Sequence, residues 1–239
     1  MTRVALIHAL EESMAPARAA VQRHWPSAFA FDVLDTSLAI DRAHAGRLQP
    51  AFYERFVALA TYAAGARGQS GSTAGILFTC SAFGPAIDAV KARVQLPVLR
   101  PNESAFRLAL KHGRSIGLVV SFNSSAESLE QELIAMADAE GVGVKVSVAV
   151  ASGALEALKA GDGRTHDSIV ARVAQRLQDV DVVVLGQFSM ARAAEVVADA
   201  GFAGRVITTP DAAVSDLRDR ILGDRSADTG RSSSTGRAT

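Results

Sequence analysis

Short apolar runs rich in valine, isoleucine and leucine alternate along the chain with longer segments of helical periodicity. This alternation is typical of parallel β-α-β units, in which a helix returns the chain between neighbouring strands. The pattern therefore predicts an α/β fold. The predicted strands are Val4–His8, Phe29–Asp35, Gly75–Thr79, Pro97–Leu99, Ile116–Ser121, Val144–Ala149, Val182–Gly186 and Val206–Thr208. The predicted helices include Pro50–Ala66, Pro85–Val94, Ser125–Ala139, Asp167–Leu177 and Met190–Ala200.

The order of these elements in the first half of the chain recurs in the second half. The strand at Val4–His8 corresponds to Ile116–Ser121, and the strand that ends before Cys80 corresponds to the one that ends before Gln187. Two copies of a four-stranded unit explain this order better than one long sheet does, although α/β proteins of this size often repeat their elements. We therefore expect two pseudo-symmetric lobes, each with a parallel four-stranded sheet flanked by helices.

The expected first lobe consists of residues 1–100 and 208–222, and the second of residues 101–207. Ligands of open parallel sheets bind beyond the carboxyl ends of the strands. If the lobes face each other, the loops after equivalent strands line one cleft, with Cys80 and Gln187 across it from each other. Residues 223–239 have no apolar periodicity, and we expect this tail to be disordered.

The composition excludes several classes of function. The 25 basic residues balance the 25 acidic ones, without the basic bias that a nucleic acid or an anionic membrane selects. The apolar stretch near the N-terminus is too short for a signal peptide, and no later stretch is long enough for a membrane helix. A single cysteine excludes an intramolecular disulfide, and no spacing of histidine and acidic residues suggests a metal site. We expect a cytoplasmic protein that binds neither nucleic acid nor membrane.

Cys80 lies at a predicted junction between a strand and a helix, where a thiol can be reactive. A buried strand runs into Thr79-Cys80-Ser81, and a glycine and a proline that suit a helix start follow. Free amides at a helix N-terminus would lower the pKa of the thiol and, with the hydroxyls of Thr79 and Ser81, could hold a substrate carboxylate. A lone cysteine is more often a small core residue. The junction and the flanking hydroxyls favour the catalytic interpretation.

The same segment carries a family resemblance. Thr79–Ile87 resembles the first active-site segment of the aspartate/glutamate/hydantoin racemase superfamily, and Val183–Ala191 resembles the second. Further similar segments, in the family's order, are Asp35–Leu38, Ile116–Val119 and Thr209–Val214. The resemblance implies two lobes with the active site between them. It also implies a cofactor-independent isomerase or racemase that acts on a small carboxylic acid by proton transfer at carbon, and a homodimer or larger homo-oligomer.

The chain departs from the family at one point. Family racemases place a cysteine on each side of the substrate's α-carbon, whereas the second position here is Gln187. An amide cannot exchange a proton at neutral pH. A different second base such as His8, a one-sided decarboxylation of a malonate-like acid, or nucleophilic addition of Cys80 in a cis–trans isomerisation would each fit. A non-catalytic carboxylate-binding protein is the remaining alternative.

The resemblance also implies the residues that contact the substrate. The loop with Ser121, Asn123 and Ser124 is similar to the position where family hydroxyls bind the carboxylate, and it also suits a helix N-cap. Phe188 shapes an apolar pocket or packs in the core. We thus expect Cys80 and His8 to be catalytic, with no cofactor and no metal ligand. The expected substrate-binding residues are Thr79, Ser81, Ser121, Asn123, Ser124, Gln187, Phe188 and Ser189.

Overall fold

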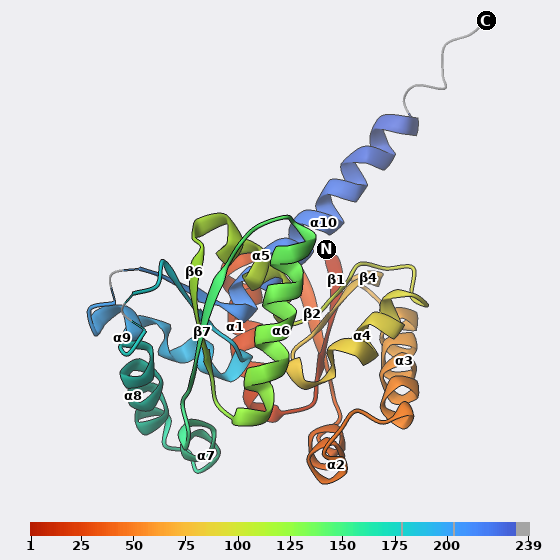
Figure 1. Ribbon diagram of the computed structural model, residues 1–239. Helices are drawn as coiled ribbons and strands as arrows, with labels where there is room; N and C mark the ends of the chain where they lie inside the picture. Colours follow the sequence, from red (N-terminus) through yellow and green to blue (C-terminus); the bar gives the residue numbers. More distant parts are fainter. Residues whose placement is uncertain (178, 203, 233–239) are drawn as a thin grey trace, which may run out of the picture.

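The chain folds into two mainly parallel sheets, each with helices on both faces (Figure 1). This computed structural model describes residues 1–177, 179–202 and 204–232, without the side chains of residues 124 and 224–232. The first sheet contains β1 (Thr2–His8), β2 (Ala28–Leu34), β3 (Arg67–Gly68), β4 (Gly71–Phe78) and β5 (Val98–Leu99). The second contains β6 (Ser115–Val120), β7 (Lys145–Val150), β8 (Val182–Leu185) and β9 (Arg205–Thr208). The predicted fold class is confirmed.

The two sheets repeat one strand order. In the first, β2, β1, β4 and β5 are neighbours in parallel, and in the second the order is β7, β6, β8 and β9. Cys80 and Gln187 therefore follow equivalent strands, β4 and β8. The first sheet differs from the prediction by a fifth strand, β3, which pairs antiparallel with β4. A tight turn makes this possible, because Gly71 takes a φ of 84°, which favours glycine.

Ten α-helices and three 3₁₀ turns connect the strands in the described part of the chain. The helices are α1 (Met14–His24), α2 (Ser37–Ala45), α3 (Pro50–Gly65), α4 (Gly84–Lys91), α5 (Glu103–His112), α6 (Asn123–Ala139), α7 (Ala154–Lys159), α8 (Gly163–Ala174), α9 (Ala194–Asp199) and α10 (Thr209–Ser232). The 3₁₀ turns are η1 (Glu11–Ser13), η2 (Ser81–Phe83) and η3 (Phe188–Ala193). None of the described helices is both long enough and apolar enough to cross a bilayer.

Four apolar clusters hold the helices on the sheets. On one face of the first sheet, Phe56 stacks on Phe78 with 5.1 Å between ring centroids and lies 4.7 Å from the ring of Phe83. Burying one such side chain contributes about 1.5–3 kcal/mol. Helices α1 and α10 cover the other face. In the second sheet, α5 and α6 pack on one face, and α8 and α9 on the other. Phe83 therefore anchors the turn that follows Cys80.

The C-terminal segment is a long helix. Helix α10 continues to Ser232, and Figure 1 shows it projecting from the body of the protein; disorder of residues 223–239 stays a prediction. The start of α10 is anchored by buried Val214, Leu217 and Ile221. Helix growth from such an anchored turn adds one hydrogen bond for each further residue. Residues 233–239 of the predicted tail lie outside the described residues. The lobe boundaries stay a prediction, and the strands of the two sheets come from residues 2–99 and 115–208.

Candidate active site

A cavity of about 850 Å³ lies beyond the carboxyl ends of the strands. Leu10, Cys80 and Arg100 reach it from the ends of β1, β4 and β5, and Phe122 reaches it from the end of β6. One face of helix α6 forms another part of the wall. The volume suits a small organic ligand, and most of the lining is apolar. The cavity therefore lies where parallel sheets of this kind bind their ligands.

Cys80 lines this cavity, as the sequence predicted for a catalytic thiol. It is a free cysteine that comes directly before η2, which leads into α4. Burial raises the pKa of the Cys80 thiol to about 11, although the Ala82 amide and the charge of Arg42 both act to lower it. The predicted lowering of this pKa is wrong, because one amide and one nearby charge do not replace the lost hydration. Cys80 is therefore a protonated thiol at neutral pH.

Arg42 is a cavity residue that the sequence did not reveal. It belongs to α2, and its charge acts on Cys80. The Nε atom of Arg42 is buried without a hydrogen-bond partner, and no acidic side chain among the described residues forms an ion pair with it. A guanidinium with unused donors can bind a carboxylate through two parallel hydrogen bonds. Ser81 lines the same cavity and adds a hydroxyl.

His8 is buried and does not line the cavity. Its side chain is buried, with Nε2 2.9 Å from Asp32 Oδ1 and Nδ1 2.9 Å from Thr79 Oγ1. Burial lowers the pKa of His8, although the hydrogen bond to Asp32 acts to raise it. In the neutral ring Nε2 then donates to the Asp32 carboxylate and Nδ1 accepts from Thr79. Thr79 is also buried outside the cavity, so both residues support the backbone that leads into Cys80.

The side chain of Gln187 is held by a hydrogen bond from Ser121, at the end of the neighbouring strand β6. Its Oε1 accepts a hydrogen bond from the Ser121 amide at 2.9 Å and lies 3.3 Å from the Ser121 hydroxyl. Its Nε2 is buried without a partner among the described residues, and neither Gln187 nor Ser121 lines the 850 Å³ cavity. Phe188 packs in the apolar cluster on the α1 and α10 face of the first sheet. Ser189 lines a separate cavity of about 440 Å³.

Helix α6 provides polar cavity residues that the sequence analysis did not single out. They recur every three or four positions and so share one helix face. Of the two predicted residues at its start, Asn123 is exposed outside the cavity, and the side chain of Ser124 lies outside the described residues. The lining side chains of α6 are Ser125, Ser128, Gln131, Glu132, Ala135, Met136 and Ala139. Their helical spacing, with serines and a glutamate on one face, could have identified this wall of the cavity from the sequence.

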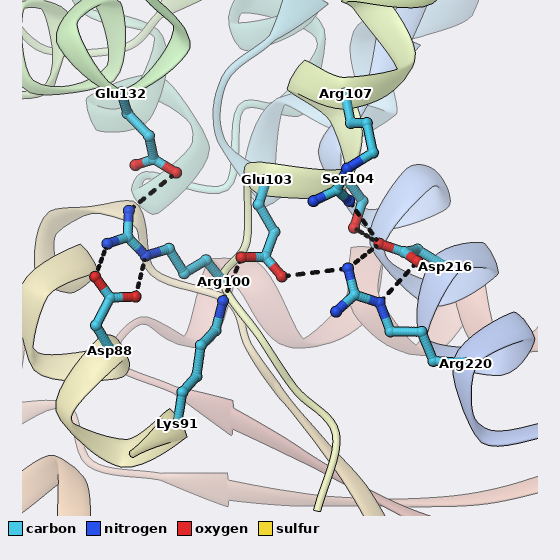
Figure 2. Close-up of polar contacts among 9 residues, drawn as sticks. All are labelled: Asp88, Lys91, Arg100, Glu103, Ser104, Arg107, Glu132, Asp216 and Arg220. Carbon is cyan, nitrogen blue, oxygen red and sulfur yellow. Dashed lines mark hydrogen bonds and ion pairs between the residues drawn. The ribbon is translucent and has the colours of Figure 1, made fainter. Parts of the chain in front are cut away.

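Arg100 and Glu132 form an ion pair in the cavity wall. Arg100 Nη1 lies 3.3 Å from Glu132 Oε1, while Arg100 Nε donates to Asp88 at 2.8 Å (Figure 2). Burial raises the pKa of Glu132, with Arg100 acting to lower it. A side chain at Gly84 would meet Arg100 Nη1 at 3.2 Å, so glycine leaves room for this contact. In the described chain, no three histidine, cysteine or acidic side chains group closely enough to hold a metal ion.

Solved structures with a similar fold include several racemases. A glutamate racemase from Bacillus anthracis superposes with a TM-score of 0.69 at 13% identity, covering 94% of this chain and 83% of that one. An allantoin racemase from Klebsiella pneumoniae gives 0.64 at 16% identity, covering 93% and 89%. A glutamate racemase from Francisella tularensis, solved with D-glutamate, gives 0.66 at 10% identity, covering 94% and 82%.

At these identities the structures show a shared fold. None of the curated proteins matches the chain significantly. The sequence profile of the Asp/Glu/Hydantoin racemase family matches residues 4–217, which covers both sheets and the cavity. The chain thus belongs to the Asp/Glu/hydantoin racemase family and is an enzyme of the racemase superfamily.

Proposed function

We propose that the protein is a cofactor-independent isomerase that moves a proton at a carbon atom of a small carboxylic acid, with Cys80 as one proton-transfer group. The observation that carries this proposal is that Cys80 and an unpaired Arg42 line the same 850 Å³ cavity. The thiol and the guanidinium are close enough for the charge of Arg42 to act on the pKa of Cys80. A carboxylate held by Arg42 would bring its α-carbon toward the thiol.

Arg42 also has a chemical role in this proposal. Removing a proton from the α-carbon of an acid places negative charge on the carboxylate oxygens, and fixed donors aimed at those oxygens stabilise the developing enolate. Arg42 and Ser81 are such donors in the cavity wall. Apolar neighbours such as Leu48, Phe83 and Phe122 favour a substrate whose remaining part is apolar or partly apolar.

The raised pKa of Cys80 favours a role as proton donor over a role as base. With a pKa of about 11 the resting group is a thiol, which donates a proton to the carbanion more readily than it removes one. His8 and Thr79 act through the backbone in this proposal, because both are buried outside the cavity. Gln187 and Ser121 act by fixing the ends of β8 and β6 to each other. Gln187 would then occupy the place of the family's second cysteine without replacing its chemistry.

A decarboxylase of a malonate-like acid is the second candidate. The same protonated thiol favours it, since loss of carbon dioxide generates the enolate directly and only one proton donor is then needed. Arg42 would hold the carboxylate that remains. This candidate differs from the isomerase in its products, because it releases carbon dioxide and leaves a shorter acid.

A panel of acids in deuterium oxide tests the proposal. The panel contains both enantiomers of aspartate, glutamate and mandelate, together with allantoin, maleate and a phenylmalonate. An isomerase exchanges the hydrogen at the reacting carbon for deuterium and forms the opposite isomer, as proton NMR and chiral chromatography would show. Release of carbon dioxide from the phenylmalonate would establish the second candidate instead. Thermal stabilisation by an acid without exchange or carbon dioxide release would indicate a binding protein and contradict both.

A further inference from the structure

Besides Cys80, the cavity lining contains one group that can exchange a proton. The ionisable residues that line the cavity are Arg42, Cys80, Arg100 and Glu132. Arginine stays protonated in proteins, so neither guanidinium can take or give a proton at working pH. Cys80 comes from the turn after β4, and Glu132 comes from helix α6. This leaves Glu132 as the partner that a two-sided proton transfer requires.

The geometry points to Glu132 as the general base that removes the substrate proton on the face opposite Cys80. This inference rests on the proposed function, because it needs an acid in the cavity and a thiol that reacts with it. It departs from the prediction that His8, at the end of β1, is the second base. The end of β8 does not contribute to this cavity, and the face of α6 does.

Glu132 has an oxygen available for this role. Its side chain is 14% exposed, and Oε1 contacts Arg100 Nη1 at 3.3 Å. The other oxygen, Oε2, forms no hydrogen bond or ion pair with any described residue, and Figure 2 draws only one contact from Glu132 to Arg100. Arg100 is already paired with Asp88 through Nε and Nη2. Glu132 therefore shares this cation with Asp88 and keeps an acceptor for a ligand.

Arg100 also fixes the position of Glu132 relative to the thiol. Arg100 lies against Gly84, which comes directly after the η2 turn that carries Cys80 at its start. Helix α6 packs against the same turn. The ion pair between Arg100 and Glu132 thus holds helix α6 next to the η2 turn. Glu132 therefore lines the cavity as the protein stands, whereas Gln187 and His8 do not.

The two groups have complementary proton states. Burial raises the pKa of both, but Cys80 starts from 9.0 and Glu132 from 4.5. The thiol is therefore the acid of the pair and the carboxylate is the base. A thiol and a carboxyl group that line one cavity can act as the acid and the base of a proton transfer. Raising the pKa of a carboxylate also makes it a stronger base.

The step balances without a further reactant. The Glu132 carboxylate takes the α-proton as the carbon–hydrogen bond breaks, and the electron pair of that bond enters the enolate held by Arg42. The sulfur–hydrogen bond of Cys80 then breaks, and its proton forms the new bond on the opposite face of the carbon. The enzyme is left with a carboxylic acid and a thiolate. One proton passing from Glu132 to Cys80 through water restores the resting state.

Enantiomer-resolved exchange tests this assignment. Wild type, Glu132→Gln, Glu132→Asp and Cys80→Ser are incubated in deuterium oxide with each enantiomer of aspartate, glutamate and mandelate, and exchange at the α-carbon is followed by NMR. Glu140→Gln, at the exposed C-terminal end of the same helix, is the matched control and keeps wild-type rates. We expect Glu132→Gln to slow exchange from one enantiomer at least about 100-fold and to keep the other within about tenfold. Cys80→Ser shows the reverse preference, and Glu132→Asp restores part of the exchange that Glu132→Gln loses.

The outcomes separate this inference from the proposed function. If wild type exchanges both enantiomers and Glu132→Gln does so within threefold, Glu132 is not the base, and the role of Cys80 stands. If Glu132→Gln slows both enantiomers equally and Glu132→Asp restores both equally, Glu132 only positions Arg100, which also overturns the assignment. If wild type exchanges no compound of the whole panel described above, the proposed function fails and this inference fails with it.

Discussion

The side-chain oxygen of Gln187 accepts a hydrogen bond from the backbone amide of Ser121 at 2.9 Å. This contact joins the ends of β8 and β6, which are adjacent strands of the second sheet. It explains why a glutamine at this position serves the structure even though it cannot exchange protons. The chemistry of the cavity must therefore come from other residues.

Gln187→Met is expected to destabilise the protein by about 1–3 kcal/mol, because the part-buried Ser121 amide loses its acceptor. Ser121→Ala removes only the longer contact at 3.3 Å and is expected to cost less than about 1 kcal/mol. Urea denaturation of the two variants measures both changes. Equal free energies of unfolding for Gln187→Met and wild type would show that this contact does not support the strand ends.

Cys80 is expected to react slowly with iodoacetamide at neutral pH. Since the thiolate is the reactive form and the pKa is about 11, the alkylation rate should rise with pH until about 11, well above the usual value of 9.0. Cys80 is the only cysteine, so mass spectrometry reports this site alone. The raised pKa also means that folded-state stability falls as the pH rises from about 9 toward 11. A rate that levels off below pH 8 would show an activated thiolate instead.

Arg42→Gln is expected to slow the alkylation of Cys80 at pH 9, because the guanidinium acts to lower the pKa of the thiol. The same variant should lose the thermal stabilisation that carboxylates give the wild-type protein, since it removes the proposed carboxylate anchor. Arg47→Gln serves as the control, because Arg47 is exposed outside the cavity and its loss should leave both measurements unchanged. Undiminished stabilisation of Arg42→Gln would place the carboxylate elsewhere.

His8 makes the stability of the fold depend on pH below 6.5, because burial lowers its pKa. Its pKa in the folded protein lies below the ordinary 6.5, so the stability contributed by the neutral ring is present above 6.5 and is lost as the pH falls through the lowered pKa. His8→Gln should be less stable than wild type at pH 8 by about 1–3 kcal/mol, because the buried Asp32 and Thr79 contacts are disturbed. The gap should narrow by pH 5. Chemical denaturation at both pH values checks this, and a gap that widens at pH 5 would contradict it.

The sequence was sufficient to predict the architecture because the strands of a parallel sheet are buried on both faces. Continuous runs such as Val182–Leu185 are fully buried and easily recognised. The repeat of the strand order then placed Cys80 and Gln187 after equivalent strands. The sequence did not reveal β3, whose two residues are exposed and depend on a local turn at Gly71.

The site was predicted only in part, because side-chain direction at a strand end depends on tertiary contacts. Cys80 and Ser81 reach the cavity from the turn after β4, as expected. His8 instead points toward Asp32 and Thr79, and Phe188 packs into the core. Arg42 gave no sequence signal, since an arginine on an amphipathic helix usually faces solvent. The predicted direction of the Cys80 pKa shift was wrong because a sequence motif does not show how deeply the thiol is buried.

The most direct test of the account compares wild type with Cys80→Ser on the acid that wild type exchanges fastest. The quantity measured is the rate of deuterium incorporation at the reacting carbon of the product isomer, with the melting temperature as a check of the fold. We predict a loss of at least about 100-fold at an unchanged melting temperature, because a hydroxyl does not give up its proton at neutral pH. Incorporation within tenfold of wild type would contradict the claim that the Cys80 thiol transfers the proton.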